Sequence, residues 1–152
     1  MSDLALRWDV TALAADLAVE ANDLARGDGL ETAVLLSLFC DRRADEGDVI
    51  PDGQTERRGW WADALPVIDG DRIGSRLWLL ARETERATVI SRVEQYAAEA
   101  LRWLIDDRVA ERVEVAAEFP RRGMRALAVT IHRPRVDPVT YRFAETWRAQ
   151  GA

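Results

Sequence analysis

The side chains best suited to chemistry in this chain of 152 residues are gathered in one segment, residues 52–80. Three of the six tryptophans lie there together with four arginines, among them Arg72. Indole and guanidinium groups dominate the energetic centres of protein interfaces, because both bury large planar surfaces and still donate hydrogen bonds. The segment therefore predicts binding chemistry, and the candidate interface residues within it are Arg57, Arg58, Trp60, Trp61, Arg76 and Trp78.

The same segment has little helical or strand period, and a loop this long inside a compact domain is usually functional or disordered. Disordered segments are poor in aromatic residues, so we expect an ordered loop. A second interpretation stays open, in which the indoles of Trp60 and Trp61 fill a small core from the loop. For Trp78, which precedes Leu79 and Leu80, core packing is the stronger alternative.

Few residues offer reactive or metal-binding groups. The single cysteine, Cys40, excludes an internal disulfide, and its place at the end of an apolar run favours a buried, inert thiol. The single histidine, His132, has the opposite strand parity from Leu127 and Val129, so we expect it at the surface. No cysteine–histidine cluster has zinc-site spacing, and the sequence lacks a glycine-rich phosphate loop. We therefore predict no catalytic residue, no metal and no cofactor.

The overall composition narrows the class of protein further. The net charge is −6, from 27 acidic and 21 basic residues, and all the basic residues are arginine. Such a balance argues against binding to duplex nucleic acid, which requires a basic face. No apolar run approaches the ~18 residues of a membrane span, and the N-terminus lacks the features of a signal peptide. We expect a single domain over residues 1–152, located in the cytoplasm of the cell that makes it.

The N-terminal third predicts short strands and one buried helix. Apolar and polar residues alternate over residues 4–8, and residues 16–24 are compatible with a second short strand and a turn. Asp28 is a good helix N-cap, and Glu31 three positions later completes an acidic variant of the capping box. The helix that follows, over residues 30–40, is apolar almost all round and should be packed on several sides.

The longest predicted helix covers residues 85–105, with Thr84 as its N-cap. Its apolar residues recur at steps of three and four and form one stripe: Val89, Val93, Tyr96, Ala97, Ala100, Leu101 and Leu104. The solvent side carries Arg92, Glu94, Glu99 and Arg102. Trp103 lies off the centre of the stripe, where it either covers the edge of the core or faces a partner; it is a further candidate interface residue.

The C-terminal third changes to a period of two. Three segments alternate apolar and polar residues, and their apolar members are Val113, Val115, Ala117 and Phe119, then Leu127, Val129 and Ile131, then Val139, Tyr141 and Phe143. Short turns join them, which predicts an antiparallel meander with one apolar face that the long helix covers. Because the helices precede the strands instead of alternating with them, the predicted class is α+β.

Several blocks carry a resemblance to a known family: residues 29–34 (GLETAV), 37–39 (SLF), 41–43 (DRR), 51–53 (PDG), 57–61 (RRGWW) and 73–80 (IGSRLWLL), with Tyr96, Ala100, Leu101, Trp103 and Leu104. On these blocks, which span nearly the whole chain, it resembles the Mu-like phage baseplate wedge family. That family is itself similar to the T-even baseplate wedge subunit with a "lysozyme-like" label.

The resemblance implies a structural subunit in the baseplate of a contractile phage tail or a tail-like injection machine. It implies partners among the other wedge subunits, including the large baseplate protein, and possibly the sheath or hub. No small-molecule substrate, nucleic acid or membrane is implied. The expected location is the host bacterial cytoplasm during assembly, and afterwards the baseplate of the particle.

The wider family also has a Gly-x-x-Leu segment before its long helix and a Glu-Pro-Arg triplet after it. Gly74 to Leu77 matches the first, whereas the second place reads Asp106, Asp107 and Arg108, in which only the arginine is unchanged. The resemblance implies a structural ion pair between Asp106 and Arg108. Two alternatives stay open: a partly buried pair, or exposed charges at the end of a helix.

Two other functions compete with a structural role. The lysozyme-like label suggests a peptidoglycan glycosidase, which needs two carboxylates about 5–9.5 Å apart beside a sugar cleft. Asp63, Asp69 and Asp71, close to Trp61 in sequence, are the best candidates. The third function is a regulatory adaptor that binds a host protein, since a fold does not determine a function.

Overall fold

The computed structural model describes residues 3–146 except 22, 28, 54 and 65–71. Its helices are α1 (Leu30–Phe39), α2 (Ala87–Ala100) and α3 (Trp103–Asp106), with the short 3₁₀ helices η1 (Pro51–Gly53), η2 (Trp61–Ala64) and η3 (Leu77–Leu80). Its strands are β1 (Asp3–Leu4), β2 (Leu6–Asp9), β3 (Ala14–Leu17), β4 (Val19–Glu20), β5 (Asp23–Leu24), β6 (Arg26–Gly27), β7 (Arg112–Arg121), β8 (Met124–His132) and β9 (Val139–Thr146). The predicted α+β class is confirmed.

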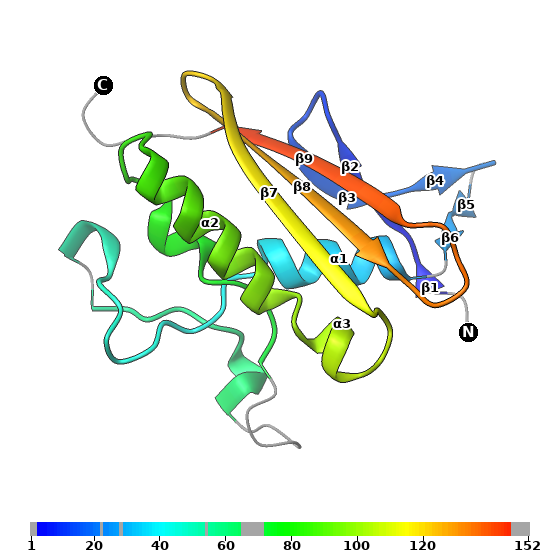
Figure 1. The fold of residues 1–152 in the computed structure, drawn as a ribbon, viewed down its shortest axis with the longest axis horizontal. Coiled ribbons are helices and arrows are strands. Elements are labelled where there is room, and N and C mark those ends of the chain that lie inside the picture. The colour runs from blue at the N-terminus through cyan, green and yellow to red at the C-terminus, as the bar shows by residue number, and fades with distance from the viewer. Residues whose placement is uncertain (1–2, 22, 28, 54, 65–71, 147–152) are drawn as a thin grey trace.

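The C-terminal strands form the predicted meander, an antiparallel sheet in the order β7-β8-β9. One face points inward, where Leu127, Val129, Ile131 and Phe143 are buried. Helix α2 lies along β7 and covers this face (Figure 1). The predicted apolar stripe is buried throughout, at Val89, Val93, Tyr96, Ala97, Ala100, Leu101 and Leu104. The apolar residues with helical period and those with strand period therefore pack together in one core.

The boundaries of the long helix differ from the prediction. Helix α2 begins after Arg86, whose side chain makes no capping hydrogen bond, and not after Thr84. It ends at Ala100, because Leu101 leaves the helical conformation and its N–H is shared between two carbonyls. The chain resumes as α3, and both Leu101 and Leu104 stay fully buried across this break. The break between α2 and α3 therefore leaves the last residues of the apolar stripe inside the core.

Helix α1 is the predicted buried N-terminal helix, with Val34, Leu35 and Leu38 almost inaccessible. Its N-cap is Gly29 in a left-handed conformation, with φ 79°, so the backbone itself turns into the helix. The predicted cap Asp28 lies outside the described residues. Cys40 follows the helix and is only partly buried; burial raises the pKa of its thiol, and the neighbouring Asp41 adds to the rise.

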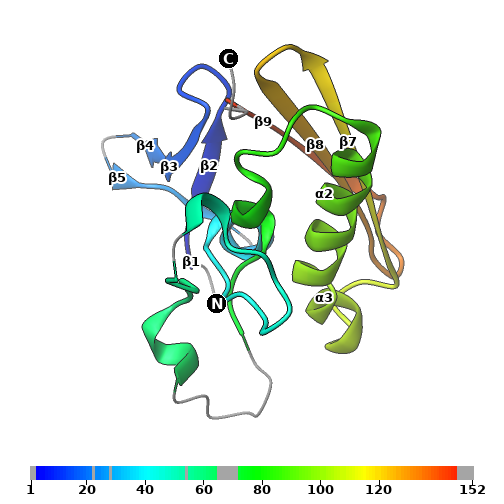
Figure 2. The same ribbon diagram turned by 90° about the vertical axis from the view of Figure 1, so that its left-hand side faces the viewer.

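The N-terminal arm, defined as residues 3–27, contains more and shorter strands than the sequence predicted. Strand β1 pairs with β6, β2 with β3, and β4 with β5, each as a separate antiparallel pair. The arm is anchored to the core by Trp8, whose ring stacks on Phe39 with centroids 4.8 Å apart. Figure 2 shows the arm on the opposite side of the molecule from α2.

Within the part of the chain that the structure describes, no helix combines the length and the apolarity needed to cross a bilayer.

His132 is the last residue of β8 and alternates with the buried residues of that strand, as predicted. Its ring lies 3.2 Å from the Arg112 guanidinium.

Candidate protein interface

Residues 72–80 are anchored to the end of α1 by backbone contacts. The Ser75 N–H donates to the Cys40 carbonyl at 2.9 Å, and the Arg42 N–H donates to the Ser75 carbonyl at 2.9 Å. The Ser75 hydroxyl donates to the Leu38 carbonyl at 2.6 Å. Gly74 precedes this contact with φ 96°, and a Cβ there would lie 2.4 Å from the Cys40 oxygen. Glycine at this position is therefore a steric requirement of the anchor.

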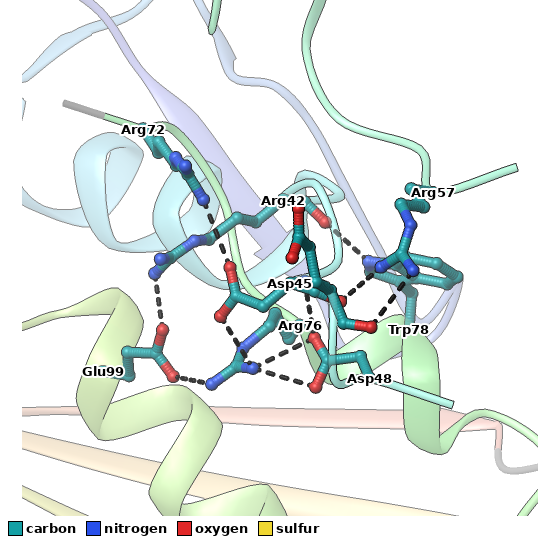
Figure 3. A network of polar contacts seen from close by, with 9 residues as sticks. Arg42, Asp45, Asp48, Arg57, Arg72, Arg76, Trp78 and Glu99 are labelled. Carbon is teal, nitrogen blue, oxygen red and sulfur yellow. Dashed lines mark hydrogen bonds and ion pairs between the residues drawn. The ribbon is translucent and has the colours of Figure 1, made fainter. Parts of the chain in front are cut away.

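A network of charged side chains then joins this segment to α2 (Figure 3). The guanidinium of Arg76, which is only 14% exposed, lies 3.0 Å from carboxylate oxygens of both Asp45 and Asp48. Its other nitrogen lies 2.6 Å from one Glu99 oxygen, and Arg42 lies 2.6 Å from the second oxygen of Glu99. Glu99 thus bridges two arginines, and the network connects three segments that are remote in sequence.

Arg76 is held as a cation by its surroundings. Its guanidinium lies 4.7 Å above the centre of the Tyr96 ring. Burial disfavours the charged form, but the hydrogen bonds to Glu99 and Asp48 outweigh it and raise the pKa of Arg76. The prediction that Glu99 faces solvent was wrong, because the segment after α1 covers that side of α2. No local signal predicted the network, since its members are up to 57 residues apart.

Arg57 and Arg72 extend the network outward. Arg57 donates to the backbone carbonyls of Asp45 and Glu46, the latter at 3.2 Å. Arg72 lies 3.2 Å from Asp45, and both side chains are about half exposed. Arg57 and Arg76 were predicted as interface residues; the structure engages both guanidiniums in contacts within the chain.

Trp78 lies in the core, in agreement with the stronger of its two alternatives. It is 8% exposed, and its indole N–H donates to the Arg42 carbonyl at 2.8 Å. The guanidinium of Arg58 lies 4.5 Å above the Trp78 ring and 2.8 Å from Asp41. Arg58 therefore seals the outer side of Trp78 while remaining close to half exposed.

Trp60 and Trp61, here called the indole pair, point away from the core. Left-handed backbone at Arg58 (φ 50°) and Gly59 (φ 107°) turns the chain outward, and a Cβ on Gly59 would lie 2.7 Å from the Arg43 Cβ. Trp60 is 46% exposed and Trp61 79% exposed, with ring centroids 5.7 Å apart. The alternative interpretation, in which these two indoles fill a small core, is therefore wrong.

Trp103 combines its two predicted roles. Its indole N–H donates to the Ser37 hydroxyl at 3.0 Å, which ties α3 to α1, yet the residue remains 36% exposed. The hydrogen bond holds the ring in one orientation at the surface.

The predicted pair of Asp106 and Arg108 is not formed. Asp106 lies 3.7 Å from Arg102, one helical turn earlier, and both of these side chains are well exposed. Arg108 is exposed and adopts a left-handed backbone conformation, with φ 60°, just after α3. With the helix ending at Asp106, Arg108 serves as the left-handed residue that terminates it.

Of the three carboxylates considered for glycoside chemistry, the structure describes only Asp63. One oxygen of Asp63 accepts the Ile73 N–H at 3.4 Å, and Asp69 and Asp71 lie outside the described residues. Among the residues that the structure describes, no group of three or more His, Cys, Asp or Glu side chains is arranged to hold a metal ion.

Comparison with known proteins gives consistent matches. A family model described as phage protein GP46 matches residues 30–138. Baseplate protein gp46 of Escherichia phage Mu is 40% identical over 144 residues, which are 94% of this chain and 95% of that protein. Mu-like prophage FluMu protein gp46 of Haemophilus influenzae is 35% identical over 147 residues, 97% of this chain and 98% of that protein.

Proposed function

The chain belongs to the GP46 family of phage proteins, and from this premise we propose that it is a structural wedge subunit in the baseplate of a contractile tail or tail-like particle. The proposal is supported by the name of the Mu relative, a baseplate protein, which aligns along nearly its whole length. We propose that the protein acts through contacts with other proteins and without a catalytic centre. Its partners would be other wedge subunits, including the large baseplate protein, and possibly the sheath or hub.

The observation that carries this proposal is the exposure of the indole pair. A tryptophan that is 79% exposed leaves most of its ring in water, beside a second indole that is 46% exposed. An indole buries roughly 150–250 Å² when it is covered, and central tryptophans commonly contribute ~2 kcal/mol or more to binding. Arg58 and Trp103 are two further candidate contact residues, which offer an exposed cation and a third partly exposed ring.

The anchoring of this surface also supports binding. The loop that carries the indole pair is pinned by the Ala44 N–H, which donates to the Arg57 carbonyl at 2.9 Å, and by the close contact of Gly59 with Arg43. Rings presented by a fixed backbone lose less conformational entropy on binding than rings on a mobile loop. The internal contacts of Arg57, Arg76 and Trp78 would thus serve the interface indirectly, by holding it.

The test is assembly of the particle in a producing strain that carries the Trp60→Ala, Trp61→Ala double variant. We expect the variant protein to fold but to be lost from purified baseplates, because the indoles no longer fill their pockets on a partner. The control is Val49→Ala, which removes an 86% exposed apolar side chain that is not one of the candidate interface residues. Normal co-purification of the double variant with baseplate proteins would overturn the interface. Absence of the unaltered protein from all particles would overturn the baseplate role itself.

A further inference from the structure

The outer face of the β7-β8-β9 sheet carries six neighbouring residues of which four are alanine, here called the alanine array. It consists of two cross-strand rows: Glu118, Ala126 and Ala144, then Ala116, Ala128 and Arg142. Residues two apart along a strand project from the same face, so both rows point the same way. The inward residue between them, Phe143, contacts Phe39 of α1 and Trp8 of the arm. Helix α1 and the arm therefore pack on the other face of the sheet (Figures 1 and 2).

The alanine array is the floor of an open hollow of about 500 Å³. Alanine methyl groups occupy its centre, and Glu118 and Arg142, which also line it, stand at diagonally opposite corners of the array. Val10, which is 72% exposed, adds an apolar side chain from the turn after β2. The hollow thus combines an apolar floor with one acidic and one basic corner.

Glu118 and Arg142 are the uncompensated charges of this face. Further along the same face, Glu114 is held by Arg112 at 2.7 Å. Glu118 and Arg142 are exposed, and neither forms an ion pair with another residue that the structure describes. From the spacing of strands and of residues along them, their Cα atoms lie about 12 Å apart. The hollow therefore offers an anion and a cation at a fixed separation.

The charges of this face also cancel. The outward positions of residues 112–118, 126–132 and 140–144 carry two arginines and two glutamates, whereas the whole chain has a net charge of −6. Net charge of one sign keeps proteins apart. A second copy that approaches this face meets equal numbers of both signs, so the repulsion between the two acidic chains is weakest here.

We propose that the alanine array is a self-association surface, at which a second copy of this chain binds face to face around a two-fold axis. An axis in the plane of the interface, perpendicular to the line from Glu118 to Arg142, exchanges these two positions. Each Glu118 then lies over the Arg142 of the other copy, which gives two charge-assisted pairs in the dimer. The second copy is the occupant because its own face supplies both charges at the matching separation, and such a contact closes at two chains.

The alanines make room for these pairs. Sheets that pack face to face lie about 10 Å apart, and at that distance facing methyl groups leave space that the long side chains of Glu118 and Arg142 from both copies fill. Water leaves the methyl groups at the centre of the array, which adds a hydrophobic contribution. A sheet of three strands makes a small interface, so we expect a weak dimer with a dissociation constant in the micromolar range.

Sedimentation equilibrium of the purified full chain, over a range of protein concentrations, tests this surface. We expect a monomer–dimer equilibrium whose dissociation constant rises at least about tenfold in Glu118→Arg and in Arg142→Glu, because each reversal brings like charges together twice in the dimer. The double variant Glu118→Arg/Arg142→Glu restores both pairs in exchanged positions. Its dissociation constant should return to within about threefold of the unaltered value.

The matched controls are Asp106→Arg and Arg102→Glu, which reverse the charges of an exposed pair at α3 and should leave the equilibrium unchanged. Glu118→Arg also makes the chain less negative, so an effect of net charge alone would strengthen association, the opposite of the expected result. A monomeric unaltered chain, or a double variant that associates as weakly as the single variants, would overturn the self-association surface. Neither outcome bears on the baseplate role, because the measurement uses the purified chain without particles.

Discussion

Arg76 and Glu99 form a charge-assisted contact of 2.6 Å that joins the segment after the indole pair to the middle of the molecule. The arginine is 14% exposed and the glutamate 29% exposed, so solvent screens this contact less than a surface pair. Glu99 also holds Arg42 at 2.6 Å, which brings the segment after α1 into the same contact. Glu99 on α2 therefore holds two chain segments that lie on either side of the indole pair in the sequence.

Removing the carboxylate charge at position 99 should destabilise the fold. A buried pair that loses one partner costs about 3–5 kcal/mol, and an exposed pair at most ~1 kcal/mol. Glu99→Gln leaves two partly buried arginines without their shared anion, so we expect a loss of about 2 kcal/mol in the free energy of unfolding. Urea denaturation measures it. Asp106→Asn is the matched control, because its pair with Arg102 is exposed, and it should change stability by less than ~0.5 kcal/mol. Equal effects for the two variants would contradict the special role of Glu99.

The glycine at position 74 should tolerate no side chain. In Gly74→Ala, the added Cβ would meet the Cys40 carbonyl oxygen at 2.4 Å in a left-handed backbone conformation. Such strain alone costs about 1–3 kcal/mol, so with the clash we expect about 3 kcal/mol or more. Gly47→Ala is the control, since a Cβ there has no neighbour within 4 Å. Thermal unfolding of both variants measures the difference, and a Gly74→Ala protein as stable as its control would refute the anchor.

The tryptophans of residues 52–80 should divide into two classes. Trp78→Ala removes a buried indole and its hydrogen bond to the Arg42 carbonyl, and such truncations cost about 3–5 kcal/mol. Trp61→Ala removes a ring that is 79% exposed, so stability should change by no more than ~0.5 kcal/mol. Unfolding free energies of the two purified variants separate the classes. A large loss for Trp61→Ala would mean that the ring serves the fold and not a partner.

Position 108, which follows α3 in a left-handed backbone conformation, should accept glycine. Arg108 adopts φ 60°, which is unfavourable for a side chain and free of cost for glycine. We expect Arg108→Gly to raise the unfolding free energy by roughly 0.5–1 kcal/mol, as glycine does at left-handed helix ends. A loss of stability would point to a contact of the guanidinium, including the ion pair with Asp106 that the resemblance implied.

The thiol of Cys40 should titrate above the range of an exposed cysteine. Burial raises its pKa first, and the negative charge of Asp41 adds to the rise. The folded protein therefore favours the neutral thiol over the thiolate. The contribution of Cys40 to the free energy of unfolding is fully present below the pKa of the unfolded thiol and is lost as the pH rises through the pKa of the folded thiol. The pH dependence of iodoacetamide alkylation measures the folded value. An apparent pKa at or below that of a model thiol would contradict this environment.

The periodic parts of the chain were predictable because their signal is local. The stripe from Val89 to Ala100 in α2 and the alternation through Val129 and Ile131 in β8 each reflect one element that buries one face, and the α+β class follows from the order of the elements. The pairing of the short strands in the N-terminal arm was not predictable from the sequence. Its strands are two to four residues long, and its pairing depends on backbone contacts between Ala5, Ala18 and Ala25.

The sequence by itself determined which residues could form a core, because helical and strand periods depend on near neighbours. It also singled out Trp60 and Trp61 as candidates. Only the tertiary structure decided which of the charged and aromatic side chains face inward: Arg76 and Trp78 became internal, whereas the indole pair stayed exposed. The physical reason is that desolvation and ion pairing depend on groups far apart in sequence, as Glu99 and Arg42 demonstrate across 57 positions.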